Sequence, residues 1–441
     1  MGLLIRGIYY FGLYLLIALL PLGAALFADS IGFARPYWVE VAVAAGFLSF
    51  SIMLLEFALV SRLRVASDPF GTDALVYFHR VLGITATLML FAHILLLIGR
   101  SADWGMLNPF SGSYGSVTGA IALWSLVVLI VSSLLRKRLR ISYTLWDHLH
   151  RWTAFIAVIT SLLHIQAFGS YTESALVRWT VAGLTVFFLG LLVTYGFVRP
   201  LRLWRRPWQV VANEDAGADT RSLTVAPVGH GGFRFEPGQF AWLITGRTPF
   251  VREQHPITIA GSAEPPADGA QQYGIKNLGD WSGSMVKALK PGDRLWVEGP
   301  YGALSIDREP AQGFVLIGGG IGITPMRSIL LTLRDRGDNR PCLLFYAAAN
   351  WDRVVYKDEL LALEGSMNLK IVWVFEQPDA DFRGERGRLS RDILARHLPK
   401  FFGYYQFFIC GPNPMMDAVE RLLADYGVPE GRIHSERFDN V

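Results

Sequence analysis

The chain has 441 residues, 52% of them hydrophobic, which is unusually apolar for a soluble protein of this length and favours a membrane-embedded part. Residues 1–207 carry 16 Lys and Arg against 8 Asp and Glu, whereas residues 208–441 carry 25 against 29, so the polar part lacks the basic excess of a nucleic-acid-binding protein. Two cysteines, Cys342 and Cys410, are too few for a disulfide framework or a four-cysteine iron–sulfur cluster.

The first half of the chain predicts six membrane-spanning helices, because six apolar stretches have the length of about 20 residues that a span requires. The stretches are 8–28, 38–60, 75–98, 117–135, 146–167 and 176–198. The first is longer than the core of a signal peptide, so we interpret it as a retained span. Arg and Lys gather after the second, fourth and sixth spans, which predicts that both ends of this integral membrane protein are cytoplasmic.

The second half predicts two further units. From Trp208 onward, short runs such as "SLTVAPV" and "QFAWLI" alternate with Gly and Pro turns, as is typical of an antiparallel β-barrel. From about Gly313 the order strand, Gly-rich turn, helix, strand predicts an α/β domain with a parallel sheet. We therefore expect a multi-domain fold with a six-helix transmembrane bundle at 1–207, a β-barrel at 208–311 and an α/β domain at 312–441.

Four histidines within the predicted spans indicate a pair of haem sites. His79 and His93 lie in the third span and His150 and His164 in the fifth, both pairs 14 residues apart. In a helix this spacing returns to within about 40° of the same face after a rise of roughly 21 Å, so two such helices side by side can hold two stacked haems. Hydrogen-bonded polar groups or a proton path are the alternative, which suits a lone histidine better than two matching pairs. His148 points about 160° away from His164 and is excluded as a ligand.

The predicted orientation assigns each histidine pair to one side of the membrane. Both spans leave the cytoplasm at their N-terminal ends, so we expect His79 and His150 to ligate the iron of an inner haem. By the same argument, His93 and His164 would ligate the iron of an outer haem.

Two motifs in the predicted β-barrel suggest a flavin site. "HPITIAG" places a Thr at a strand end, where it can hydrogen-bond a flavin, and "KNLGDWSG" offers backbone N–H groups and a hydroxyl to a pyrophosphate. Each motif alone would be an ordinary turn, and their combination after six spans is the more specific signal. The candidate flavin-binding residues are His255, Pro256, Ile257, Thr258, Lys276, Gly279, Trp281 and Ser282.

Two turns in the predicted α/β domain suggest a nicotinamide-dinucleotide site. In "GGGIGITP" the glycines let the backbone approach a pyrophosphate at a helix N-terminus, although the pattern departs from G-x-G-x-x-G at Ile323. In "FFICGPNPMM" an apolar strand ends in Cys-Gly-Pro, and Cys410 is either a small buried residue or a neighbour of the nicotinamide. The candidate residues are Gly318, Gly319, Gly320, Gly322, Thr324, Pro325, Cys410, Gly411 and Pro412, together with Arg353 after the next strand.

With these motifs the whole chain resembles the ferric reductase and NADPH oxidase superfamily. The first half is similar to its ferric-reductase-like transmembrane domain, and the second half is similar to ferredoxin-NADP reductase. The resemblance implies FAD, two b-type haems and a reduced pyridine nucleotide, and it makes Phe438 in "SERFDNV" the candidate for a C-terminal aromatic that stacks on the flavin. Three residues follow Phe438, whereas many relatives end on the aromatic.

The pyridine nucleotide is expected to be NADPH, with NADH left open. The segment "YAAANWDR" has no acidic residue at the strand tip to hold a ribose 2′-hydroxyl, and Arg353 suits a 2′-phosphate, but Asp352 beside it opposes that reading.

The predicted function is that of a transmembrane oxidoreductase in a lipid bilayer. Electrons would pass from cytoplasmic NAD(P)H through FAD and the two haems to a small extracytoplasmic acceptor, either ferric iron or dioxygen with superoxide as the product. The alternative is an electron-donating subunit for a partner protein or a quinone. A protein partner is possible but not required, and a scaffold without haem is disfavoured by the intact histidine pairs.

Overall fold

The computed structural model describes residues 3–28, 36–61, 71–250, 254–264, 266, 268–279, 281–308 and 310–437. The chain divides into two compact units, one made of residues 1–69 and 74–195 and the other mainly of residues 196–441. Each unit has its own hydrophobic core.

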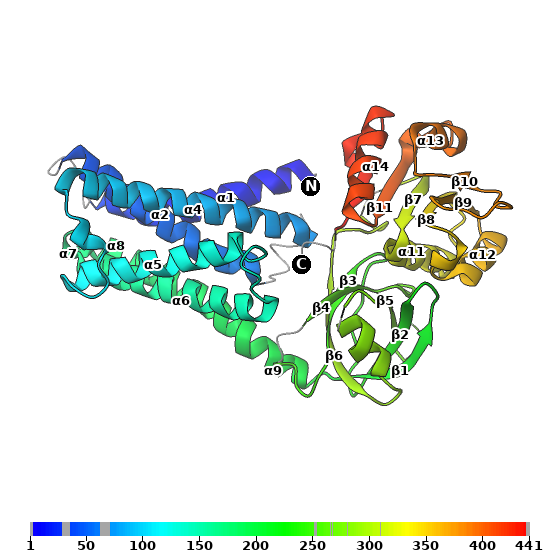
Figure 1. Cartoon of the computed structure of the whole chain (residues 1–441), viewed down its shortest axis with the longest axis horizontal. Helices are drawn as coiled ribbons and strands as arrows, with labels where there is room; N and C mark the ends of the chain where they lie inside the picture. Colours follow the sequence, from blue (N-terminus) through cyan, green and yellow to red (C-terminus); the bar gives the residue numbers. More distant parts are fainter. Residues whose placement is uncertain are drawn as a thin grey trace. The chain divides into compact units, whose positions relative to one another are not determined.

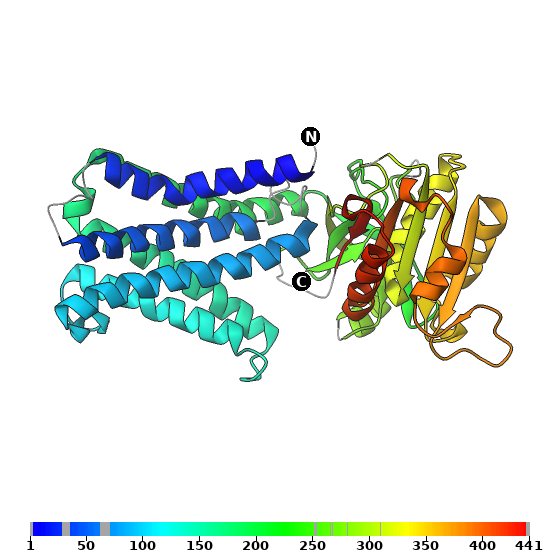
Figure 2. The ribbon, with the colours of Figure 1, turned by 90° about the horizontal axis from the view of Figure 1, so that it is seen from above.

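The first unit is a bundle of long helices that run side by side (Figures 1 and 2). The long helices are α1 (Leu3–Phe27), α2 (Tyr37–Val60), α4 (Gly71–Ser101), α5 (Tyr114–Leu134), α6 (Tyr143–Ala167) and α8 (Ala175–Val193). Short helices η1 (Trp104–Leu107) and α7 (Gly169–Thr172) lie between them. The boundary between the units falls within η2 (Thr194–Val198), and α9 (Arg199–Trp204) belongs to the second unit. Ser113 and Ser142 cap α5 and α6 by accepting hydrogen bonds from the first-turn backbone N–H groups.

Among the described residues, five helices are long and apolar enough to cross a membrane: α1, α2, α4, α5 and α8. Helix α6 has 25 residues but carries Asp147, His148, His150 and Arg151 in its first half, which lowers its hydropathy. The apolar helices expected from the sequence are therefore present, and the count of six spans stays a prediction. Helix α2 is the most buried of the five, and it shares one hydrophobic core with α1, α4, α6 and α8.

The second unit begins with an antiparallel sheet. Its strands are β1 (Trp208–Asp215), β2 (Thr220–Pro227), β3 (Phe240–Ile244), β4 (His255–Thr258), β5 (Gln271–Lys276) and β6 (Arg294–Tyr301), in the order β4-β3-β6-β1-β2-β5. Ile259, directly after β4, forms an isolated bridge with Tyr273 of β5, so the two edge strands meet at this point. The antiparallel sheet agrees with the sequence, and a fully closed barrel stays a prediction. The short helices η3 (Trp281–Met285) and α10 (Val286–Ala288) lie between β5 and β6.

A parallel sheet with helices on both faces completes the second unit. The strands β7 (Gly313–Gly319), β8 (Cys342–Ala348), β9 (Leu369–Phe375), β10 (Glu385–Arg386), β11 (Tyr405–Cys410) and β12 (Ile433–Ser435) lie in the order β10-β9-β8-β7-β11-β12. Helices α11 (Ile323–Asp335) and α12 (Lys357–Ser366) pack on one face, and α13 (Arg391–His397) and α14 (Asn413–Asp425) on the other. The short helices are η4 (Gly320–Gly322), η5 (Trp351–Arg353), η6 (Phe402–Tyr404) and η7 (Glu430–Arg432). Along β7, Leu316 and Ile317 point to opposite cores, as a strand buried on both faces requires.

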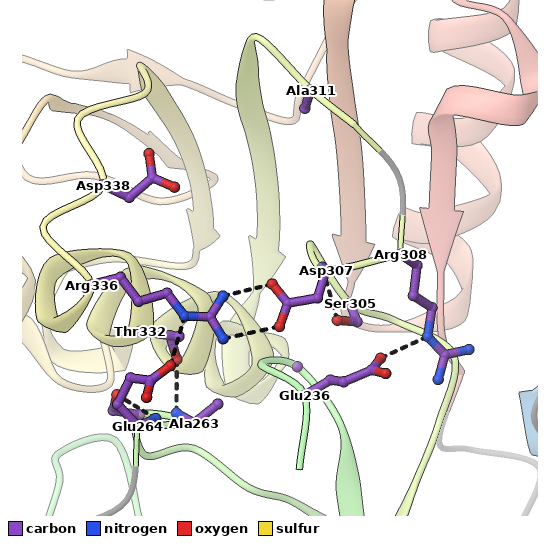
Figure 3. A network of polar contacts seen from close by, with 12 residues as sticks. Glu236, Ala263, Glu264, Ser305, Asp307, Arg308, Ala311, Thr332, Arg336 and Asp338 are labelled. Carbon is purple, nitrogen blue, oxygen red and sulfur yellow. Dashed lines mark hydrogen bonds and ion pairs between the residues drawn. The ribbon is translucent and has the colours of Figure 1, made fainter.

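Ion pairs connect the parallel-sheet part to the antiparallel-sheet part. Arg336, just after α11, binds both carboxylate oxygens of Asp307 at 2.6 and 3.0 Å and also binds Glu264 at 2.8 Å (Figure 3). Nearby, Arg308 binds Glu236 at 2.8 Å. Inside α11, the buried Arg327 donates to the carbonyl of Ala260 at 2.7 Å. The contacts of Arg336 and Arg327 fix the two sheets of this unit against one another, and the Arg308–Glu236 pair lies within the antiparallel-sheet part.

Candidate functional site

The structure brings the four candidate histidines together as two facing pairs. The rings of His79 on α4 and His150 on α6 have centroids 6.2 Å apart, and those of His93 and His164 on the same two helices are 6.1 Å apart. Both helices thus present two imidazoles on one face, as the spacing of 14 residues predicts.

Backbone carbonyls orient the imidazoles of the second pair. Nδ1 of His93 lies 2.8 Å from the carbonyl oxygen of Ala42 on α2, and Nδ1 of His164 lies 2.8 Å from that of Gly115 on α5. A carbonyl can only accept a hydrogen bond, so each Nδ1 carries the proton. Nε2 is left as the unprotonated nitrogen, which is the form of imidazole that binds a metal.

Side chains, in place of backbone carbonyls, orient the imidazoles of the first pair, His79 and His150. Nδ1 of His79 contacts the carboxylate of Glu56 on α2, and Nδ1 of His150 lies 3.1 Å from the hydroxyl of Ser133 on α5. Because Ser133 donates its own proton to the carbonyl of Leu129 at 2.6 Å, it accepts from His150. His150 thus donates from Nδ1 as His93 and His164 do, and His79 does so when Glu56 is ionised, which leaves Nε2 for a ligand.

Two glycines let the supporting helices approach the second pair. A Cβ at Gly46 would lie 2.9 Å from Nδ1 of His93, and a Cβ at Gly119 would lie 2.5 Å from Nδ1 of His164. Each glycine lies four residues after the carbonyl that accepts from the same imidazole, so carbonyl and glycine share one helix face. The backbone of α2 thus packs directly against the His93 ring, and the backbone of α5 against the His164 ring.

The pair formed by His93 and His164 borders a cavity of ≈ 270 Å³, whose other walls are mostly apolar side chains. Two metal–nitrogen bonds of about 2 Å, added to the radii of the two rings, separate ring centroids by about 6 Å, as seen in both pairs. The unprotonated Nε2 atoms, the ring separation and the apolar cavity fit a haem held by two imidazoles.

The two flavin-motif segments meet in the second unit. The imidazole of His255, at the start of β4, stacks on the indole of Trp281 with centroids 3.7 Å apart and planes 17° from parallel. Trp281 Nε1 in turn donates to the hydroxyl of Thr245 at 2.8 Å, which fixes the indole. Residues 26 positions apart in the sequence therefore form one aromatic surface.

His255 has an unused polar atom in this surface. Burial lowers the pKa of His255 to about 4, so the ring is neutral at pH 7. Its Nε2 is buried and has no hydrogen-bond partner in the described part of the chain. Leaving a polar atom unpaired costs about 1–3 kcal/mol, which a hydrogen bond from a bound group would offset. This atom and the stacked rings fit a bound flavin.

The other candidate flavin residues lie next to His255 or Trp281 in the sequence. Pro256, Ile257 and Thr258 continue β4 and pair with β3, and Lys276 ends β5. The hydroxyl of Ser282 accepts from the N–H of Leu278 at 2.9 Å and donates to the carbonyl of Gly279 at 3.3 Å, which closes the turn. Phe438 lies outside the described residues.

The two candidate dinucleotide turns lie side by side at the carboxyl edge of the parallel sheet. A Cβ at Gly322 would lie 2.2 Å from the carbonyl oxygen of Cys410, and a Cβ at Gly411 would lie 3.2 Å from Gly319. Strands β7 and β11 pair directly, while β8 and β9 extend the sheet from the other side of β7. The turns thus meet where the strand order reverses, the usual ligand-binding position in such sheets.

The remaining nucleotide candidates occupy the same edge or its neighbourhood. Gly318 ends β7 together with Gly319, Gly320 adopts φ +54°, and Thr324 and Pro325 lie in the first turn of α11. Pro412 precedes α14. Arg353, in η5 after β8, is exposed and lies 3.3 Å from the carboxylate of Asp219. Cys410 is buried.

Sequence reasoning missed the residues that support the histidines. Glu56 is an acidic residue within an apolar stretch. Because an ionisable side chain in a membrane span costs free energy, its position alone is a signal that the sequence offers. Ser133, Gly46 and Gly119 carry no comparable signal, since Ser and Gly are common in membrane helices. Their roles depend on which helix packs beside which histidine.

Comparisons with known proteins match both halves of the chain. Residues 45–161 match the family described as ferric reductase like transmembrane component, and residues 316–421 match the oxidoreductase NAD-binding domain. The chain is 29% identical over 238 residues to the propane 2-monooxygenase reductase component of Rhodococcus jostii (strain RHA1), covering 52% of this chain and 62% of that protein. It is 30% identical over 245 residues to a flavohemoprotein of Bordetella pertussis, covering 53% of this chain and 60% of that protein.

The chain thus spans about 60% of the length of these curated relatives. Among solved structures, the flavohem-like FAD/NAD binding domain of nitric oxide dioxygenase from Vibrio cholerae matches with a TM-score of 0.47 and 22% identity, covering 53% of this chain and 98% of that one. The two family matches show a segment like the ferric reductase transmembrane component joined, in one chain, to a segment like an oxidoreductase NAD-binding domain.

Proposed function

We propose that this protein moves electrons from cytoplasmic NAD(P)H through FAD and two b-type haems to an acceptor on the extracytoplasmic side of a membrane. The observation that carries the proposal is the pairing of four imidazoles on α4 and α6, each with Nδ1 engaged and Nε2 available. A haem held by two imidazoles transfers single electrons without opening a coordination position.

The residues divide between an inner and an outer haem. His79 and His150 hold the inner haem, and His93 and His164 hold the outer one. The polypeptide positions these groups in an apolar bundle and excludes water from them. Both termini of the protein are cytoplasmic in this proposal, because the basic connections follow the second, fourth and sixth spans.

The second half of the chain supplies the electrons. We assign residues 1–207 to the transmembrane di-haem domain, 208–311 to an FAD domain and 312–441 to an NAD(P) domain. The stacked pair of His255 and Trp281 binds FAD, and the glycine turns after β7 and β11 receive the pyrophosphate and nicotinamide of NADPH or NADH. FAD bound there would supply the change from two-electron hydride transfer to one-electron transfer.

The small acceptor is ferric iron or dioxygen. Detergent-purified protein loaded with FAD and haem should oxidise NADPH faster when ferric citrate is added under nitrogen if ferric iron is the acceptor. Superoxide formed in air without iron would instead make dioxygen the acceptor. The His164→Leu variant is the control, because it should lose both activities while NADPH still reduces the FAD. Activity that survives in this variant would contradict the proposed route.

A further inference from the structure

Glu56 is a carboxylate buried within the apolar helix α2. The residue is 9% exposed and lies in a stretch of otherwise uncharged side chains near the end of the helix. An ionisable group in such a place costs several kcal/mol unless a partner compensates for it. The partner is His79, whose Nδ1 contacts Glu56 Oε2. Because burying this carboxyl group costs free energy, its contact with His79 indicates a role beyond packing.

The four paired imidazoles differ in the acceptor that holds Nδ1. His93 and His164 donate to backbone carbonyls, and His150 donates to a hydroxyl. His79 is the member of this set whose Nδ1 contacts a carboxyl group, to which it donates when Glu56 is ionised. Hydrogen bonds to an ionised acceptor are roughly twice as strong as those between neutral groups. Nδ1 of His79 therefore shares its proton more fully, and its Nε2 becomes the more basic ligand atom.

We propose that Glu56 is a positioning residue that lowers the reduction potential of the inner haem by making His79 a more basic ligand. The inference rests on the proposed function, in which His79 and His150 hold that haem. A more basic imidazole stabilises ferric over ferrous iron, so a haem held by His79 would have a lower reduction potential and would be the better one-electron donor.

The carboxylate also fixes the ring. Glu56 and His79 lie on different helices, 23 residues apart in sequence, so their contact sets the imidazole plane as well as its charge. Glutamine at position 56 keeps the size and an acceptor oxygen but removes the charge. It therefore separates the electrostatic effect from ring orientation.

The test is a redox titration of the full chain, purified in detergent and loaded with haem, followed by visible absorbance. Glu56→Gln should shift the reduction equilibrium of the inner haem about tenfold towards the ferrous form, which is ~59 mV for one electron. The outer-haem midpoint should not change. Glu40→Gln, the same substitution at another buried carboxylate of α2, is the matched control and should leave both midpoints unchanged.

The outcomes separate this inference from the proposed function. If Glu56→Gln keeps both haems and both midpoints, the inference is wrong and the haem assignment stands. If the wild-type chain binds no haem, or His79→Leu keeps both haems, the proposed function itself fails. If the Gln variant holds too little inner haem to titrate, Glu56→Asp decides, since it keeps the charge. If the reduction equilibrium of the inner haem in Glu56→Asp stays within about threefold of wild type, the inference is supported. A shift of that equilibrium by about tenfold or more overturns it.

Discussion

Gly119 lies so close to the imidazole of His164 that a Cβ at this position would be 2.5 Å from Nδ1. The two residues come from neighbouring helices, α5 and α6. Backbone and ring could not approach in this way if position 119 carried a side chain. The contact therefore makes a glycine part of the candidate site even though it provides no functional group.

Gly119→Ala should displace the His164 ring and lower the affinity for the outer haem by on the order of tenfold, since the hydrogen bond that orients the ring is disturbed. The measurement is haem occupancy by absorbance after purification. Gly183→Ala on α8, where nothing lies within 4 Å of an added Cβ, is the matched control and should keep full occupancy. Equal haem occupancy in the two variants would show that close packing of Gly119 against His164 is not needed for haem binding.

His150→Leu should remove the inner haem, about half of the haem absorbance, and block reduction of external acceptors by NAD(P)H. The comparison is His148→Leu, two residues earlier on the same helix and on another face, which should retain both haems. Loss of a haem in the second variant would contradict the assignment of ligands by helical phase.

Gly322→Ala should impair use of the nicotinamide nucleotide, because the added methyl would lie 2.2 Å from the carbonyl oxygen of Cys410 and push the two turns apart. Displacement of a binding turn by about 1 Å can lower rates on the order of 10²-fold. Stopped-flow reduction of the flavin by NADPH measures this effect. Gly365→Ala in α12 has open space around its Cβ and should reduce at the wild-type rate.

Acidification should destabilise the fold around His255. The folded-state pKa of about 4 lies below the ordinary value of 6.5, so the unfolded chain binds the proton more readily. The free energy of unfolding therefore falls as pH decreases from about 6.5 to about 4.

The His255→Phe variant keeps an aromatic ring to stack on Trp281 but cannot be protonated. Thermal unfolding of flavin-free protein should show a stability difference between wild type and variant that moves against the wild type as pH falls through this window. A difference that is independent of pH would show that His255 is not buried in its neutral form.

Much of the membrane part follows from the sequence. The spans are visible as apolar runs because a bilayer demands a fixed length of apolar helix. The histidine positions follow from the helical period, which places residues 14 apart on one face. Antiparallel strands, a parallel α/β part and glycine turns between strand and helix were also predictable, since each depends on local backbone preferences.

The contacts between helices did not follow from the sequence. His93 and Ala42 are 51 residues apart, and His164 and Gly115 are 49 apart. Periodicity fixes the angle between side chains along one helix, but the rotation of that helix towards its neighbours is set by side-chain packing. The acceptors of the four Nδ1 atoms therefore appear only in the folded chain.

The same limit applies to the second half of the chain. The sequence supplies two separate motifs around His255 and Trp281, and only the tertiary structure stacks their rings at 3.7 Å. Likewise, the approach of Gly322 to Cys410 depends on β7 and β11 being neighbours in the sheet.

The sequence by itself determined the candidate residues in the paired histidines, the flavin motifs and the glycine turns, because ligand atoms, apolar length and helical period are local properties of the chain. The tertiary structure decided which of those residues face one another and which carboxylate, hydroxyl or carbonyl holds each ring. Those relationships depend on the packing of helices and strands distant in sequence, and no local pattern encodes that packing.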